Sequence, residues 1–472
     1  MRPIIEASRG RNVPSVQRRH RGLRAGAAAA LLFVAGCATV DPAPRPLDPT
    51  AILRRLRSSE PASPVVAREA GAIAALTLEQ AAALAVERNP QLQVVRAEVG
   101  VSRARLVEAG LLPDPAVGWD AMDVLANQWV NGDTEQENFV VGFGLTWRMP
   151  RPGEISALEA AALATLERSE WAVMRSEWRL AQDVAEAWIA LASARARLAA
   201  ANDLLELGRR TATALERARE VSAATGVEAN LAAIDVADLE LQRLEIEDEE
   251  VESRQRLNRL LGLAPTANYP IADPAGLLDA ETEGFDAAAI VDKAVLQRPD
   301  LKELLADYAA AEAALRLEVV RQFPEISIGT GLELTLPIFS RWNGPAIDRA
   351  FAEREVMRRA VDAEIAGLRA EVHAAVAAYR KARRQADYIA QNVEPRLEES
   401  LRLTEASLAA RELSTLEVLL TQRQILDTRM RALEARFTSA SHRIRVLAAS
   451  GTLFRQGAPT PGNAEPPSET DR

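Results

Sequence analysis

The sequence FVVGFGLTWR at residues 139–148 decides how the rest of this chain is interpreted. Every second residue from Phe139 to Trp147 is apolar, and most of the residues between them are small or polar. This alternation is the period of a β-strand with one apolar face. Prolines flank the stretch on both sides, at Pro113, Pro115, Pro150 and Pro152. We therefore predict a β-hairpin over residues 113–150. A lone hairpin is marginal in water, so other copies of the chain or lipid must cover its apolar face.

The remaining composition is that of a long-helix protein. The 472 residues are 48% hydrophobic and 26% charged but only 4% aromatic, which favours long antiparallel, coiled-coil-like helices. The fold class expected is therefore mainly α with a small β part. A net charge of −10 without a basic stripe argues against nucleic-acid binding. With three histidines, one cysteine and no phosphate-binding loop, the sequence predicts no enzyme, no cofactor and no metal site.

The N-terminal residues have the pattern of a secretion signal. An arginine-rich segment and a short apolar run, Ala25 to Ala35, end at Ala35-Gly36-Cys37, so residues 1–36 are predicted to be a signal peptide. The two small residues directly before the cysteine, Ala35 and Gly36, indicate a bacterial lipobox, in which Cys37 becomes lipidated. The alternative is a buried thiol. Residues 37–72 are rich in proline and alanine and are expected to form a lipidated tether.

An internal repeat organises the rest of the chain. Asn89-Pro90 matches Arg298-Pro299 at a fixed offset, and Pro115 matches Pro324 at the same offset. Two repeats are predicted, at 73–262 and 285–450, joined by a linker at 263–284 and followed by a disordered tail at 451–472. Each repeat is expected to contain a helix, a β-hairpin, a long helix, a turn and a further helix. We expect uninterrupted helices over 78–110, 153–225, 226–261, 345–410 and 414–449, with turns near residues 226 and 412.

The two predicted hairpins differ in length. Thirty-four residues separate Pro115 from Pro150, whereas twelve separate Pro324 from Pro337. Two membrane-spanning strands require about twenty residues before any turn is counted. Three interpretations follow for residues 324–337. The segment forms a short hairpin that turns near Gly329 to Gly331 without spanning fully, it carries a deletion that damages a barrel, or the chain is not a channel.

Several motifs together resemble the TolC-like outer-membrane efflux proteins. They are the lipobox, residues 76–81 through Asn89-Pro90, Gly226, residues 257–262 and residues 336–341. The resemblance implies a homotrimer in which each protomer gives four strands to a 12-stranded outer-membrane β-barrel, above a periplasmic α-helical tunnel. It also implies partnership with a periplasmic adaptor protein and an inner-membrane efflux pump. The alternative is a periplasmic coiled-coil scaffold lipoprotein without a conducting pore.

Three groups of residues are candidates for function. The resemblance places the adaptor contacts at the two helical turns: Gly226, Val227, Glu228, Arg411, Glu412, Leu413 and Ser414. Gly226 also fits a C-terminal helix cap. Three tryptophans could lie at the membrane interface or could simply pack between elements: Trp119, Trp147 and Trp342. The acidic run at residues 245–252 is either a solvated helix face or a lumen charge that favours cations.

Overall fold

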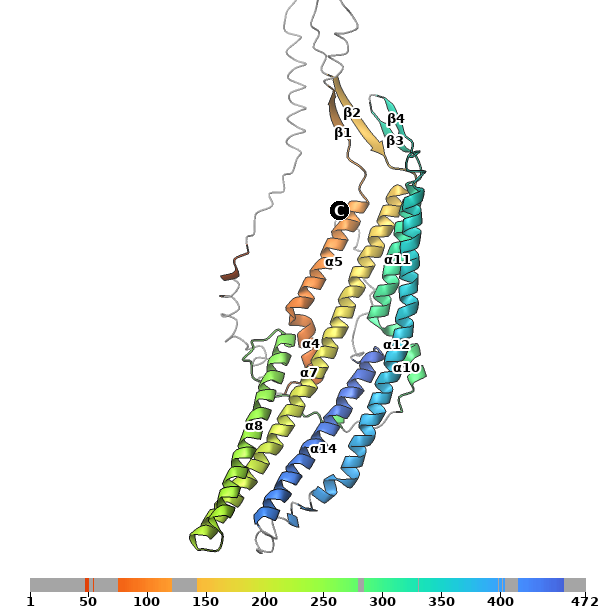
Figure 1. Cartoon of the computed structure of the whole chain (residues 1–472). Coiled ribbons are helices and arrows are strands. Elements are labelled where there is room, and N and C mark those ends of the chain that lie inside the picture. The colour runs from red at the N-terminus through yellow and green to blue at the C-terminus, as the bar shows by residue number, and fades with distance from the viewer. Residues whose placement is uncertain are drawn as a thin grey trace, which may run out of the picture. The chain divides into compact units, whose positions relative to one another are not determined.

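The computed structural model describes residues 47–50, 54, 75–120, 142–278, 284–329, 331–397, 399–400, 402–403 and 415–453. Contacts divide the chain into two units, Met1–Ala62 and Ser63–Arg472, and the description below concerns the second unit. The predicted signal peptide, Cys37, most of the tether, and the tail from residue 454 lie outside the described residues. The mainly helical class with a small sheet is confirmed (Figure 1).

Nine labelled helices make up most of the described chain: α4 (Leu78–Arg88), α5 (Pro90–Ala109), α7 (Glu154–Glu220), α8 (Gly226–Leu261), α9 (Ala275–Leu278), α10 (Ala287–Gln297), α11 (Pro299–Val320), α12 (Gly344–Asn392) and α14 (Thr415–Ala449). Helix α7 has 67 residues, a length of about 100 Å at 1.5 Å per residue. Among the described residues, no helix is both long enough and apolar enough to cross a membrane.

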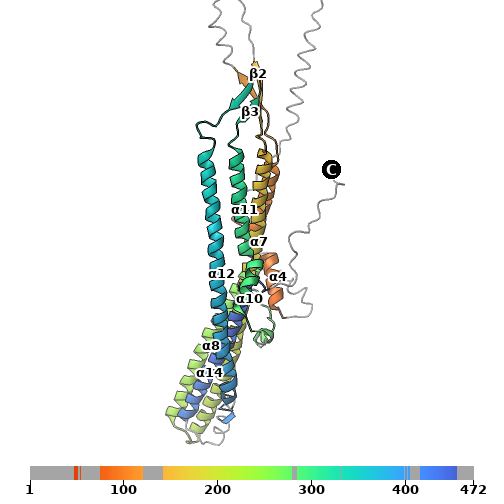
Figure 2. The same ribbon diagram turned by 90° about the vertical axis from the view of Figure 1, so that its right-hand side faces the viewer.

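The helices are arranged side by side around α7. Near the sheet the order is α5, α7, α11 and α12, and in the far half it is α8, α7, α14 and α12 (Figures 1 and 2). The core lies where α7 meets α4, α8 and α14, and its centre contains Val184, Trp188 and Leu191 at the spacing of a coiled-coil seam. Helix α12 packs against α11 near the sheet and against α14 in the far half, and α10 also contacts it.

Both repeats break a helix at an X-Pro step, so the single helix predicted over 78–110 is wrong. Pro90 disfavours the helical conformation at the residue before it, and Asn89 accordingly has ψ of 121°. The Asn89 carboxamide oxygen accepts hydrogen bonds from the backbone N–H groups of Gln91 (2.9 Å) and Leu92 (3.2 Å) and so caps α5. Its Nδ2 donates to the Leu260 carbonyl at the end of α8 (3.0 Å).

The corresponding step in the second repeat has different chemistry. Arg298 precedes Pro299 and has ψ of 127°, but its guanidinium bonds to the Asp300 carboxylate (2.6 Å) and to Glu371 of α12 (2.8 Å). The same guanidinium lies 5.0 Å from the ring centroid of Trp178 on α7. Burial alone would lower the pKa of Arg298, but its two carboxylate partners raise it. This side chain therefore links three helices.

Two further helix ends differ from the predictions. Helix α12 ends at Asn392 rather than continuing to residue 410, because Pro395 has no N–H to extend the helical hydrogen-bond pattern. Helix α7 ends at Glu220, before the predicted residue 225. Ser222 there has a φ of 56°, and the Ala223 N–H donates to the Ala218 carbonyl (2.7 Å). This is a Schellman motif with serine at the left-handed position.

The sheet has four antiparallel strands in the order β1 (Ala116–Asp120), β2 (Gly142–Met149), β3 (Glu325–Ile328) and β4 (Leu332–Thr335). The second hairpin turns between Ile328 and Leu332, where the short-hairpin interpretation placed its turn. Gly329 is required at this turn, because a Cβ atom there would lie 2.9 Å from the Leu145 carbonyl oxygen of β2. Strands β2 and β3 therefore join the two hairpins into one sheet.

Candidate functional site: the sheet and the helical ends

One face of the sheet is apolar across all four strands. The register pairs Val117 with Leu145, Trp147 with Ile328, and Ile328 in turn with Leu332. Paired residues share a face, and the next such row contains Met149, Ile326 and Leu334. Leu332 is 76% exposed, so this face is not covered by the described part of the chain. The opposite face carries polar groups: Thr146, Arg148, Glu325, Ser327, Glu333 and Thr335.

The structure describes the side chains of two of the three candidate tryptophans. Trp147 is half-buried, and its Nε1 donates to the Pro113 carbonyl (2.8 Å), so it ties β2 to the segment before β1. Trp119 pairs in register with Phe143. Its side chain lies outside the described residues. Trp342 is half-exposed in the turn before α12, where residues 341–343 have φ values of 50°, 57° and 61°. Asn343 holds this turn by donating to the Glu318 carbonyl (2.8 Å).

An ion-pair network joins the sheet to α7, and the sequence reasoning missed it. The Glu154 carboxylate lies 3.2 Å from Arg148 and 3.3 Å from Arg151. Glu325 of β3 lies 3.0 Å from Arg151 and 3.6 Å from Arg148. The Arg-x-x-Arg-x-x-Glu spacing of residues 148–154 is a local signal from which the pairing of Glu154 with both arginines could have been predicted. The fourth member, Glu325, lies too far away in the sequence to be predicted from that spacing.

The environment of Glu154 favours its charged form. Burial of this carboxyl would raise its pKa, but hydrogen bonds from the Arg151 backbone N–H and the Arg148 guanidinium outweigh burial. The positive charges of both arginines act in the same direction, and the pKa of Glu154 is lowered as a result. The network therefore fixes the geometry of the strand-to-helix junction most firmly when Glu154 is ionised.

The first predicted tip lies at the end of the α7–α8 pair. The Thr225 hydroxyl accepts from the Glu228 N–H (3.2 Å), and the Glu228 carboxylate accepts from the Thr225 N–H (2.7 Å), which forms a capping box. Gly226 is the first residue of α8, so the interpretation of it as a C-terminal cap is wrong, and Ser222 has that position. Val227 is 69% exposed. The second tip, Arg411 to Ser414, lies outside the described residues.

The acidic run on α8 divides into paired and unpaired members. Glu247 bonds to Arg243 (2.8 Å), and Glu249 bonds to Arg197. Glu250 is buried and bonds to Arg195 (3.0 Å). Three others are exposed and have no ion pair in the described part of the chain: Glu245, Asp248 and Glu252.

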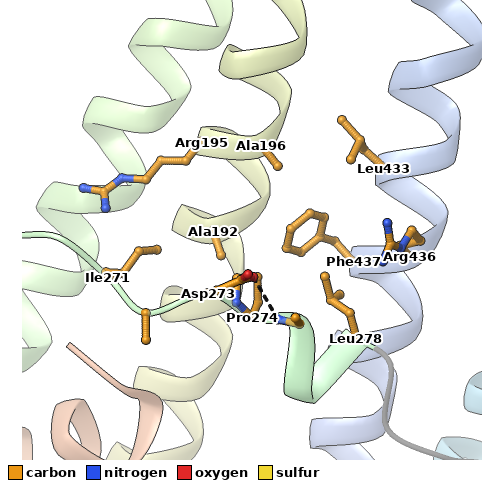
Figure 3. A pocket seen from close by; sticks show the side chains of 12 residues that line it. Ala192, Arg195, Ala196, Ile271, Asp273, Pro274, Leu278, Leu433, Arg436 and Phe437 are labelled. Atoms are coloured by element: carbon orange, nitrogen blue, oxygen red, sulfur yellow. Dashed lines mark hydrogen bonds between the residues drawn. The ribbon is translucent and has the colours of Figure 1, made fainter. Parts of the chain in front are cut away.

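A surface pocket of about 490 Å³ lies between α7, α14 and the α9 segment (Figure 3). Its walls are mostly apolar, with Ala192 and Phe437 on opposite sides and Arg195 at the rim. The Arg195 guanidinium is already bonded to Glu250 and to the Tyr269 carbonyl (3.2 Å), so it belongs to the packing of these helices. In the described residues no group of His, Cys, Asp and Glu is arranged to hold a metal ion.

Comparisons with known proteins identify similar chains. No protein-family model matches. The cobalt-zinc-cadmium resistance protein CzcC of Cupriavidus metallidurans is 24% identical over 389 residues, which cover 78% of this chain and 88% of that protein. The CmeC outer-membrane channel of Campylobacter jejuni matches with a TM-score of 0.64 at 15% identity, over 81% of this chain and 87% of that one. The open-state MtrE outer-membrane channel of Neisseria gonorrhoeae matches with a TM-score of 0.62 at 18% identity, over 80% and 89%.

Proposed function

Because the chain has the fold of solved outer-membrane channels, we propose that it is the outer-membrane channel of a tripartite efflux system. In this proposal it catalyses no reaction. It is a passive conduit for cargo expelled by an inner-membrane pump and handed on through a periplasmic adaptor. The observation that carries the proposal is this fold together with a sheet that is apolar on one face and exposed there.

The open edges of the fold support assembly as a ring. Among the described strands the sheet ends at β1 on one side and at β4 on the other, and both of these edges are unpaired there. In the far half, α8 and α12 lie at opposite edges of the row of helices, and α10 contacts part of α12 (Figure 1). Since the two edges differ, copies would join head to tail, and such contacts form a cyclic oligomer when the rotation between successive copies closes. Three copies with four strands each would give the 12-stranded barrel proposed here, with its apolar face toward lipid.

The remaining parts of the proposal concern the ends of the molecule. Lipidation of Cys37 would anchor the chain to the outer membrane, and Trp119, Trp147 and Trp342 would lie near its interface. The adaptor would bind the far helical ends, at Gly226 to Glu228 and at Arg411 to Ser414. The resistance named for the C. metallidurans relative makes divalent cobalt, zinc and cadmium the first cargo to test.

Reconstitution into planar bilayers tests the channel directly. The purified protein, prepared as a stable trimer, is expected to produce discrete conductance steps, and the absence of conductance from such a trimer would contradict the proposal. The scaffold alternative predicts a species that becomes soluble when the lipid anchor is removed. In cells, deletion of the gene is expected to raise sensitivity to the cargo, and re-expression is expected to reverse it.

A further inference from the structure

Helix α8 carries an exposed stripe that nothing in the described chain covers. Leu241 is 60% exposed, and Leu244 is also exposed. Asp248 and Glu252 continue the stripe at helical spacing, with Glu245 beside them. These residues lie on the side of α8 opposite its buried positions, such as Leu239 and Leu257. The stripe therefore points away from α7 and is apolar at one end and acidic at the other.

Helix α12 carries a stripe of the opposite charge on its exposed side. Lys381, Arg384 and Tyr388 are exposed, and Tyr388 is 65% exposed. Their side of the helix is opposite the buried Tyr379 and Ala386. Neither Lys381 nor Arg384 has an ion pair among the described residues.

A groove of about 600 Å³ between α12 and α14 begins at this stripe. Arg431 and Glu434 of α14 line it together with Lys381 and Arg384, so three of its four charged groups are positive. On α12 itself Arg383 is paired with Asp387 (2.9 Å). The stripe on α12 is therefore basic, with an aromatic residue at one end.

The two stripes lie at the same level along the bundle. Glu250 of α8 bonds to Arg195 of α7, and Arg195 lines the pocket that contains Phe437 of α14 (Figure 3). One residue further along α14, Thr438 lines the groove that contains Lys381 of α12. In Figure 1, α8 and α12 lie at opposite edges of the far half with α7 and α14 between them. The stripes therefore cannot meet within one chain.

We propose that the α8 stripe of one copy docks against the α12 stripe of the next copy. The inference rests on the ring proposed above, because rotation in a closed ring adds no shift along its axis and brings equal levels together. Helices α8 and α12 run in opposite directions, so along the bundle the residue numbers increase on one helix and decrease on the other. The pairs are then Leu244 with Tyr388, Asp248 with Arg384, and Glu252 with Lys381.

A charge exchange tests this register. Asp248→Arg with Glu252→Lys places like charges against Arg384 and Lys381, so the trimer fraction in detergent at 0.15 M salt should fall about tenfold. Arg384→Asp with Lys381→Glu should have the same effect, and all four substitutions together should restore the trimer. Asp427→Arg, an exposed acid on α14 outside both stripes, is the control. A trimer fraction unchanged by either pair of reversals, or a four-residue exchange that fails to restore it, would overturn the inference.

Cysteine cross-linking provides a second measurement that does not depend on stability. Asp248→Cys with Arg384→Cys should give disulfide-linked oligomers under mild oxidation. Asp248→Cys with Ala374→Cys should not, because ten residues displace the partner by about 15 Å along α12. Equal linkage of both pairs would refute the register. A trimer that conducts but neither cross-links at 248/384 nor responds to charge reversal would overturn the interface and leave the channel function standing. Absence of any oligomer would reject both.

Discussion

Replacing Glu154 by Gln should destabilise the junction between the sheet and α7. The Glu154 side chain is 6% exposed and accepts hydrogen bonds from the Arg148 guanidinium, the Arg151 guanidinium and the Arg151 N–H (2.9 Å). Glutamine keeps the shape but loses the charge, and both arginines retain Glu325. We therefore expect a loss of about 2 kcal/mol, within the range for hydrogen bonds to charged groups. Over a chain of this length that corresponds to about 2–3 °C in the thermal midpoint.

The pH dependence of this difference provides the sharper measurement. Because the pKa of Glu154 is lowered from its usual 4.5 in the folded protein, its carboxylate stabilises the fold above that usual value. The stabilisation is lost as the pH falls through the lowered folded-state pKa. The difference in thermal midpoint between the wild type and Glu154→Gln should therefore be largest at pH 7 and should disappear in acid.

Circular dichroism of the purified protein in detergent, followed during heating at several pH values, provides the assay. Glu167→Gln on the same helix, an exposed residue, is the matched control and should leave the thermal midpoint unchanged. A double-mutant cycle with Glu325→Gln should give a non-additive effect, because both carboxylates share the same two arginines. Equal midpoints for wild type and Glu154→Gln at pH 7 would refute this account of the junction.

Three further substitutions test other parts of the structure. Gly262→Ala should lower the thermal midpoint, because Gly262 has φ of 67° and a Cβ there would lie 2.8 Å from the Arg88 carbonyl oxygen; the left-handed conformation alone costs about 1–2 kcal/mol. Leu191→Ala, at a fully buried position, should cost about 2–5 kcal/mol, whereas Leu163→Ala at an exposed position of α7 should cost little in the same melting experiment. Val227→Asp at the first tip should impair efflux in a susceptibility assay without changing the trimer fraction, and unchanged susceptibility would count against adaptor binding there.

The parts of the fold that sequence predicted best are those set by local pattern. The alternation ending at Trp147 and the glycines around residue 330 located strand β2 and the turn of the second hairpin. Thr225 and Gly262 likewise marked both ends of α8. These features depend on residues within a few positions of one another, so a single sequence contains the necessary information.

The errors arose where two local signals competed or where partners were distant. The predicted helices 78–110 and 345–410 run through Asn89 and Val393, past the helix breaks that Pro90 and Pro395 impose. The pairing of Glu325 with Arg151 joins residues from different repeats, and no local spacing predicts it. The level shared by α8 and α12 likewise follows only from how α7 and α14 pack between them.

The two X-Pro steps make different bonds in the folded chain. Asn89 bonds within its own half of the chain, to α5 and to the end of α8. Arg298, at the equivalent position, bonds to α12 of its own half and stacks on Trp178 of the other. The two steps are therefore not interchangeable. A chain assembled from two copies of the first half would keep its helix caps but would lose this bond between the halves.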